Sequence, residues 1–297
     1  MNNKSTNIIN NKKKKTIYSD RHIYQPLLFN PDIDIQSEFL TKSDKSKTIQ
    51  ESMYVYELSA LASQSAIDTS SSAIIPSTHT EWIIGYNHSD NNAIFYCIGP
   101  VTKRKQYDLG NYEHYFGVCF DDICSYFAKG ISKDTYPSSM INEIFKYNPS
   151  PDSYEYELIQ NFKTSNDFSK HIAMFNAFLK KAKQCCYIPD NMITLTSMIK
   201  KAYGNIHISE LATNLGYSER HILRMFNETL GMPPKDYCKI IRFENVLDNM
   251  LTCKRQNNSA YITGLGYSDQ AHFQREFKTF TGLTPRQFLK ILKRVNN

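Results

Sequence analysis

Residues 219–230 place side chains that could hydrogen-bond to DNA bases along one face of a predicted helix. The spacing i, i+3, i+4, i+7 is the spacing of one exposed helical stripe. The stripe consists of Arg220, Leu223, Arg224 and Asn227. An arginine can donate two hydrogen bonds to O6 and N7 of guanine, and the major groove of DNA is wide enough to admit one helix. The chemistry that this face could perform is therefore the reading of base-pair edges.

A second stretch, residues 268–280, has the same design. Its outer stripe contains Ala271, Gln274, Arg275 and Lys278, and its inner stripe contains phenylalanine at 273, 277 and 280. Glutamine can pair with N6 and N7 of adenine, so Gln274 and the preceding Gln270 are further candidates for base contacts.

The two stretches belong to an internal repeat. Residues 215–218 (Leu-Gly-Tyr-Ser) recur as residues 265–268, and residues 231–237 match residues 282–288 in the positions of glycine, proline and an aromatic side chain. Each copy predicts two helices joined by a tight turn, the helix-turn-helix arrangement. In the first copy we expect Ser209 to cap the first helix, Gly216 to make the turn and Ser218 to cap the second helix. The Ser218 and Ser268 hydroxyls would then lie at helix N-termini, where backbone N–H groups attract phosphate.

The last ~105 residues resemble the DNA-binding domain of the AraC/XylS family of bacterial transcription regulators. Residues 266–278 (Gly-Tyr-Ser-Asp-Gln-Ala-His-Phe-Gln-Arg-Glu-Phe-Lys), followed by Gly-Leu-Thr-Pro at 282–285, carry the resemblance. It implies that Arg224 and Arg275 read bases, and Arg220, Gln270 and Gln274 are further groove-facing candidates. Leu223 could contact a thymine methyl group. The predicted phosphate contacts are Ser218, Asn227, Ser268, Lys278 and Arg286.

This resemblance implies a regulator that binds double-stranded DNA in two successive major grooves. Most members of the family are activators, so we expect an activator that acts with RNA polymerase in a bacterial cytoplasm. No enzymatic activity, cofactor or metal is expected. In the family the N-terminal domain binds an effector or mediates dimerisation, so a small-molecule effector, a protein effector and a homodimer all stay open.

Charge is distributed unevenly along the 297 residues. The net charge is +6, but residues 1–190 hold 20 Lys and Arg against 21 Asp and Glu, whereas residues 191–297 hold 15 against 8. An excess of positive charge confined to the last third is typical of a region that meets a polyanion. The apolar content of 41% excludes a largely disordered chain, and no run of about 18 apolar residues suggests a membrane span.

The chain is long enough for about two domains. We expect a disordered basic arm at 1–20, a sensor or dimerisation domain at 21–184, a linker at 185–190 and a DNA-binding domain at 191–297. The two helix-turn-helix motifs would span about 206–230 and 259–280, with one connecting helix at 235–251 between them.

The N-terminal domain is predicted to be an antiparallel, cupin-like β-barrel with added helices, which makes the fold class α+β. Short alternating runs predict strands at 53–58, 73–75, 82–86, 93–98 and 112–120, with a hairpin loop at 88–92. Helical periodicity predicts helices at 122–129, 138–146, 154–162 and 166–183.

The helix at 166–183 carries a heptad-like seam. It consists of Phe168, Ile172, Phe175 and Leu179, which are the dimerisation candidates. Packing onto the barrel and pairing with a second subunit explain this seam equally well.

A weaker resemblance links the N-terminal domain to the sensor domains of the family, including a variant with an Ile-Pro…Glu-x-x-x…Gly-x-x-Phe layout. Here Ile75-Pro76, the stretch that begins at Glu81 and residues 116–120 carry it.

Two alternatives come from other functional classes. His79, His88 and His114 could belong to a cupin-like metal enzyme tethered to DNA, although their spacing favours ordinary histidines. The barrel could instead bind a partner protein that controls the regulator without any small molecule. Cys185-Cys186 could be a redox switch, although adjacent cysteines rarely form a disulfide.

Overall fold

The structure is a computed structural model, and it describes residues 33–43, 50–60, 73–88, 90, 92–120, 140–181, 189–252 and 264–295. The predicted basic arm, the predicted helix at 122–129 and Cys185-Cys186 lie outside these residues.

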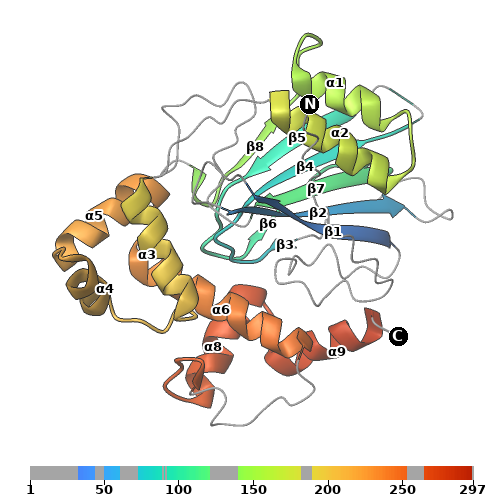
Figure 1. Ribbon diagram of the computed structural model, residues 1–297. Helices are drawn as coiled ribbons and strands as arrows, with labels where there is room; N and C mark the ends of the chain where they lie inside the picture. Colours follow the sequence, from blue (N-terminus) through green and yellow to red (C-terminus); the bar gives the residue numbers. More distant parts are fainter. Residues whose placement is uncertain are drawn as a thin grey trace.

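An antiparallel sheet forms the N-terminal part (Figure 1). Its strand order is β1-β2-β7-β4-β5-β8, and β3 pairs with β6 in a separate two-stranded sheet. The strands are β1 (Ile33–Ser43), β2 (Gln50–Ala60), β3 (Ala73–Ile74), β4 (Thr80–Tyr86), β5 (Ala93–Ile98), β6 (Lys105–Gln106), β7 (His114–Phe120) and β8 (Ile144–Tyr147). The predicted hairpin loop is present, because β4 pairs with β5 and the Asn87 N–H donates to the Asn92 carbonyl.

Period-two alternation gives the sheet two apolar faces. Along β2, Met53 and Val55 enter one core cluster, whereas Tyr54, Tyr56 and Leu58 enter the other. The predicted inner stripe of β7 behaves in the same way, since Phe116, Val118 and Phe120 all lie in the first cluster. Both faces of the central strands are buried, so these strands read as continuous apolar runs.

Two helices, α1 (Tyr154–Phe162) and α2 (Phe168–Lys181), lie across the first face (Figure 1). The four dimerisation candidates Phe168, Ile172, Phe175 and Leu179 are all buried there with the sheet residues of their own chain. The seam of α2 therefore packs onto the sheet, and the prediction that these side chains form a dimer surface is wrong. On the sheet, Trp82 of β4 takes the place that a second subunit would fill, since its ring contacts the rings of Phe175 and Phe178 in α2.

A buried ion pair joins these two helices to the sheet. His171 Nδ1 of α2 lies 2.9 Å from Glu57 Oε1 of β2, and Tyr86 donates to the same carboxylate oxygen. His171 Nε2 faces the Phe162 and Ser165 carbonyls. Burial disfavours the charged ring, but the hydrogen bond and charge of Glu57 and the two carbonyls outweigh it, so the pKa of His171 is raised.

The helix predicted at 138–146 is wrong. Residues 144–147 form β8, which pairs with the edge of β5 from Ile98 to Phe95. The backbone leaves any helical path at Asn142, whose φ is 62°. Pairing with an open sheet edge therefore overrides a weak local helical pattern. The strands β1, β6 and β8 are additions to the predicted set.

The rest of the described chain is helical, which confirms the α+β fold class. The helices are α3 (Asp190–Lys201), α4 (Ile208–Leu215), α5 (Glu219–Leu230), α6 (Pro234–Thr252), α8 (Gln270–Thr281) and α9 (Pro285–Val295). Among the described helices, none combines the length and the apolar content that crossing a membrane would require.

The long helix α6 is shared by two hydrophobic clusters. Its first half, including Tyr237 and Ile241, packs with α3, α4 and α5. Its second half, including Phe243 and Leu247, packs with α8 and α9. The two helical units therefore share one continuous helix, α6.

Candidate nucleic-acid interface

The first helix-turn-helix unit is formed by α4 and α5. Gly216 ends α4 with φ 68°, in the left-handed region, and only three residues separate the two helices. Ser218 caps α5 as predicted, since its side chain accepts from the His221 N–H. The predicted cap at Ser209 is wrong, because α4 begins at Ile208 with His207 at the cap position. The extended backbone of His207 already allows the helix to start two residues earlier.

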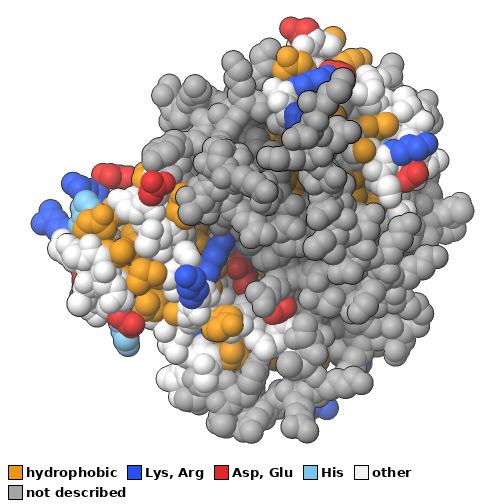
Figure 2. Space-filling model, in the orientation of Figure 1, with side chains coloured by type: hydrophobic (Ala, Val, Ile, Leu, Met, Phe, Trp, Pro, Cys, Tyr) orange, Lys and Arg blue, Asp and Glu red, His pale blue; other side chains and the backbone are white. Residues whose placement is uncertain are grey.

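The inner face of α5 is anchored in the core. Ile222, Met225, Phe226 and Leu230 are buried against α3, α4 and the first half of α6. All four residues of the predicted outer stripe are exposed, as is the cap Ser218. Figure 2 shows Lys and Arg side chains at the outer tip of the helical region, where α4 and α5 lie.

Arg224 is held only loosely in this state. Its guanidinium lies 3.1 Å from His221 Nδ1 and 3.9 Å from Glu228 Oε1, and its side chain is 63% exposed. An exposed i,i+4 pair of this kind is worth about 0.3–0.5 kcal/mol, so Arg224 is available to an external acceptor.

The second unit presents α8 in the same way. Phe273, Phe277 and Phe280 are buried, whereas Gln270, Gln274, Arg275 and Lys278 are exposed. The helix begins one residue later than predicted. Asp269, not Ser268, is the N-cap, and its carboxylate accepts from the His272 N–H at 2.7 Å. That backbone hydrogen bond is the main reason that the pKa of Asp269 is lowered.

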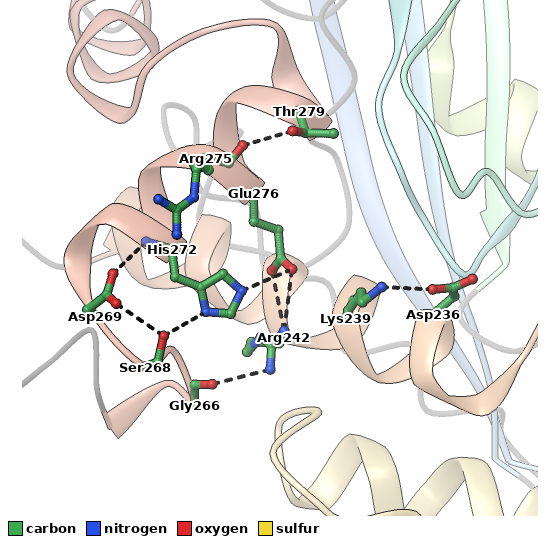
Figure 3. A network of polar contacts seen from close by, with 10 residues as sticks. All are labelled: Asp236, Lys239, Arg242, Gly266, Ser268, Asp269, His272, Arg275, Glu276 and Thr279. Carbon is green, nitrogen blue, oxygen red and sulfur yellow. Dashed lines mark hydrogen bonds and ion pairs between the residues drawn. The ribbon is translucent and has the colours of Figure 1, made fainter.

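Ser268 keeps a place beside the helix N-terminus without capping it. Its hydroxyl lies 3.2 Å from His272 Nδ1 (Figure 3). The residues before Gly264 in this copy are outside the described ranges, so α8 is the part of the second motif that the structure shows.

A polar network that sequence reasoning missed ties α8 to α6 (Figure 3). Arg242 of α6 lies 3.4 Å from Glu276 Oε2, donates to the Gly266 carbonyl at 3.3 Å and stacks over the ring of Tyr267, 4.7 Å from its centroid. Burial, then the Glu276 carboxylate, raises the pKa of Tyr267. The signal in the sequence was a lone arginine within the otherwise apolar face of the connecting helix.

The N-terminus of α9 follows directly. Thr284 and Gln287 form a reciprocal cap: the Thr284 N–H donates to Gln287 Oε1 and the Gln287 N–H donates to Thr284 Oγ1. The predicted phosphate contact Arg286 is exposed in this first turn.

The three histidines that could have belonged to a metal enzyme do not lie together. The His88 and His114 rings touch at 4.7 Å between centroids, while His79 lies against Glu244 of α6. Within the described ranges, no group of three or more His, Cys, Asp or Glu side chains could hold a metal ion.

Comparison with known proteins gives a match in the same region. A family model described as a helix-turn-helix domain matches residues 211–291. An uncharacterized HTH-type transcriptional regulator of Haemophilus influenzae is 27% identical over 96 residues, which are 32% of each chain. One of Staphylococcus aureus is 34% identical over 87 residues, 29% of this chain and 11% of that protein. The matched part of the chain thus spans about a third of the Haemophilus influenzae protein and about a tenth of the Staphylococcus aureus protein.

Two solved structures are similar to this chain at low sequence identity. The C-terminal domain of AraT, a response regulator from Geobacillus stearothermophilus, is 20% identical, with a TM-score of 0.33, 35% of this chain covered and 88% of that chain. ToxT from Vibrio cholerae, solved with an unsaturated fatty acid bound, is 14% identical, with a TM-score of 0.43, 88% of this chain covered and 96% of that chain.

Proposed function

We propose that the chain is a sequence-specific DNA-binding transcription regulator of AraC type, because residues 211–291 match a helix-turn-helix domain model. The observation that carries the proposal is the pair of exposed, arginine-bearing faces on α5 and α8, each backed by its own core cluster and both mounted on α6.

The two helices would enter successive major grooves on one side of the DNA. The 19 residues of α6 span about 28 Å at 1.5 Å per residue, close to the ~34 Å of one turn of DNA. Because Arg242 fixes α8 on α6 and the buried face of α5 fixes the other unit, the distance between the two faces is set by one rigid element.

Residue roles follow from position on each helix. The base-reading set is Arg220, Leu223, Arg224, Gln270, Gln274 and Arg275. The phosphate-contacting set is Ser218, Asn227, Ser268, Lys278 and Arg286. Ser218, at the positive end of the α5 dipole, is well placed for a phosphate oxygen.

The finer parts of the proposal rest on the resemblance to the AraC/XylS family. We include an activating role through contact with RNA polymerase, in the bacterial cytoplasm, and control through the N-terminal region by a small molecule or a protein. A homodimer stays within the proposal, but on a surface other than the buried seam of α2.

The direct test is selection of DNA sequences by the full-length chain from a random pool, followed by footprinting on the chromosome. We expect an operator with two short blocks of preferred bases, centred about 10–10.5 base pairs apart. Retention of the random pool without enrichment, or a single short block, would contradict two reading helices. Varying salt in the same assay separates specific from purely electrostatic binding.

A further inference from the structure

The connection between β3 and β4 reaches out of the N-terminal sheet and into the helical region. Ile75 is 1% exposed, yet it belongs to neither core cluster of the sheet. It packs instead in the cluster of α6, α8 and α9, with Phe243 and Leu247 among its members. Its neighbour Ile74 packs on the other side, in the second cluster of the sheet. Two adjacent isoleucines therefore serve two different cores.

Polar contacts reinforce this insertion at Glu244 of α6. The Thr78 N–H donates to Glu244 Oε1 at 3.1 Å, and His79 Nε2 lies 3.5 Å from the same oxygen. The side chain of His79 is 7% exposed and that of Glu244 is 15% exposed, so the pair is largely screened from solvent.

The segment is equally well fastened to the sheet. Ser77 and Val101 exchange two backbone hydrogen bonds of 2.9 Å. His79 Nδ1 lies 3.2 Å from the Phe120 carbonyl at the end of β7, and because a carbonyl only accepts, this nitrogen donates. Pro76 fixes its own φ and stiffens the chain just after Ile75. Residues 75–79 therefore contact both the N-terminal part of the chain and α6.

The position of these contacts on α6 gives them a consequence. Phe243 and Glu244 directly follow Arg242, the residue that holds α8 to α6. They lie in the half of α6 that supports the second recognition helix, and not in the half that supports α5.

We propose that residues 75–79 are a coupling segment that links the N-terminal sheet to the second recognition helix. Ile75 packs in the cluster of α6, α8 and α9, and Thr78 and His79 contact Glu244 of α6. The Ile75-Pro76 pair is then an interdomain anchor. The coupling would let a change in the N-terminal region alter the placement of α8 while α5 keeps its position. Its consequence for DNA rests on the proposed function; the physical contact does not.

The test is amide hydrogen exchange of the full-length chain, which needs no DNA. Ile75→Ala should raise exchange rates in residues 243–250 at least about tenfold and leave residues 219–230 within about twofold of the parent. Ile74→Ala is the matched control. It removes the same atoms from the adjacent residue, whose side chain packs in the second cluster of the sheet. It should raise exchange in β4 and β5 and leave α6 unchanged. Unchanged rates in residues 243–250 for Ile75→Ala, or the same pattern for both variants, would overturn the proposal.

A second variant keeps the test open if Ile75→Ala does not fold. Glu244→Gln removes the charge of the carboxylate with little change in volume and should raise exchange in residues 243–250 about threefold. Glu228→Gln, an exposed carboxylate on α5, should change nothing there. Equal rates for Glu244→Gln and the parent would count against the coupling. A failure of the DNA selection would instead sink the proposed function and leave this exchange result intact.

Discussion

Arg242 of α6 and Glu276 of α8 form an ion pair with 3.4 Å between Nη2 and Oε2, and both side chains are less than 15% exposed. Glu276 is the direct neighbour of Arg275 in the sequence. Glu276 of α8 therefore binds α6, while the preceding residue, Arg275, is exposed (Figure 3). On the proposed function, Arg242 is a positioning residue that would affect DNA binding through the orientation of α8.

Replacing Arg242 by methionine should destabilise the chain by about 3 kcal/mol, because Glu276 and the Gly266 carbonyl lose their partner in a mostly buried place. Chemical denaturation measures this cost. Lys239→Ala removes a cation from the exposed Lys239–Asp236 pair on the same helix and should cost less than about 0.5 kcal/mol. Equal midpoints for the two variants would show that the network carries no stability.

The predicted base-reading arginines should affect affinity and specificity together. Arg224→Ala or Arg275→Ala should each weaken binding to the selected operator by about 1–3 kcal/mol and relax preference at one base step, because a bidentate contact is lost. Binding to operators substituted one base at a time measures this. Each variant should affect a different block of the operator. A uniform loss over both blocks would argue against the assignment of one recognition helix to each block.

Phosphate-contacting cations should behave differently. Lys278→Ala or Arg286→Ala should weaken binding to all sequences alike and reduce the magnitude of the slope of log K against log salt by about one, because one fewer counterion is released. Titration at several salt concentrations with the selected operator and a scrambled duplex gives both quantities. Lys170, exposed on α2 away from both recognition helices, is the matched control for charge removal. A selective loss on the operator would reassign the residue to base reading.

Protonated His171 should make stability depend on pH. Its pKa in the folded chain is raised above the ordinary 6.5, so its contribution is complete below about pH 6.5 and is lost as pH rises through the folded-state value. The free energy of unfolding should therefore fall over that window. His171→Asn should abolish this fall and cost about 3 kcal/mol at pH 6, since Glu57 is left buried without its counter-charge.

Two controls isolate the histidine. His207→Asn, at an exposed position, should leave the pH profile unchanged. Glu81 needs its own variant, because burial raises its pKa from 4.5 to about 7 and so lowers stability over that range as pH rises. Glu81→Gln should remove the Glu81 part of the fall, between about pH 4.5 and 7, and keep the part that His171 contributes above pH 6.5. A parent profile that is flat above pH 6.5 would contradict the charged His171.

Two glycines in left-handed conformation should differ in their tolerance of alanine. Gly216 (φ 68°) has nothing within 4 Å of an added Cβ, so Gly216→Ala should cost about 1 kcal/mol of backbone strain. Gly204 (φ 74°) would place its Cβ 2.2 Å from the Cys238 carbonyl oxygen of α6, so Gly204→Ala should cost more than about 3 kcal/mol. Thermal unfolding compares them directly, and similar losses would mean that α6 yields at this contact.

The sequence predicted the elements that depend on local rules. The first recognition helix needed only a cap, a turn glycine and an inner stripe of Ile222, Phe226 and Leu230, all of which lie between residues 216 and 230. The strands β2, β4, β5 and β7 were equally legible, since alternation and a polar turn suffice to mark a hairpin.

What escaped prediction depends on long-range packing. The Thr78–Glu244 hydrogen bond joins residues 166 positions apart, and no local pattern announces it. The seam of α2 was ambiguous because a helix buried on a sheet and a helix buried in a dimer show the same spacing. The strand β8 exists because β5 offers an unpaired edge, which residues 144–147 alone do not reveal.

The two recognition helices begin on different caps, a neutral hydroxyl at Ser218 and a carboxylate at Asp269. Each helix start also carries one carboxylate: Glu219 in the first turn of α5, and Asp269 at the cap of α8, where it already accepts the His272 N–H. The two halves of the repeat therefore differ at their helix starts: the neutral hydroxyl of Ser218 fills the cap of α5, and the carboxylate of Asp269 fills the cap of α8. On the proposed function, the operator would have a direction, because exchanging its two blocks would present each block to a helix with a different cap and a different outer stripe.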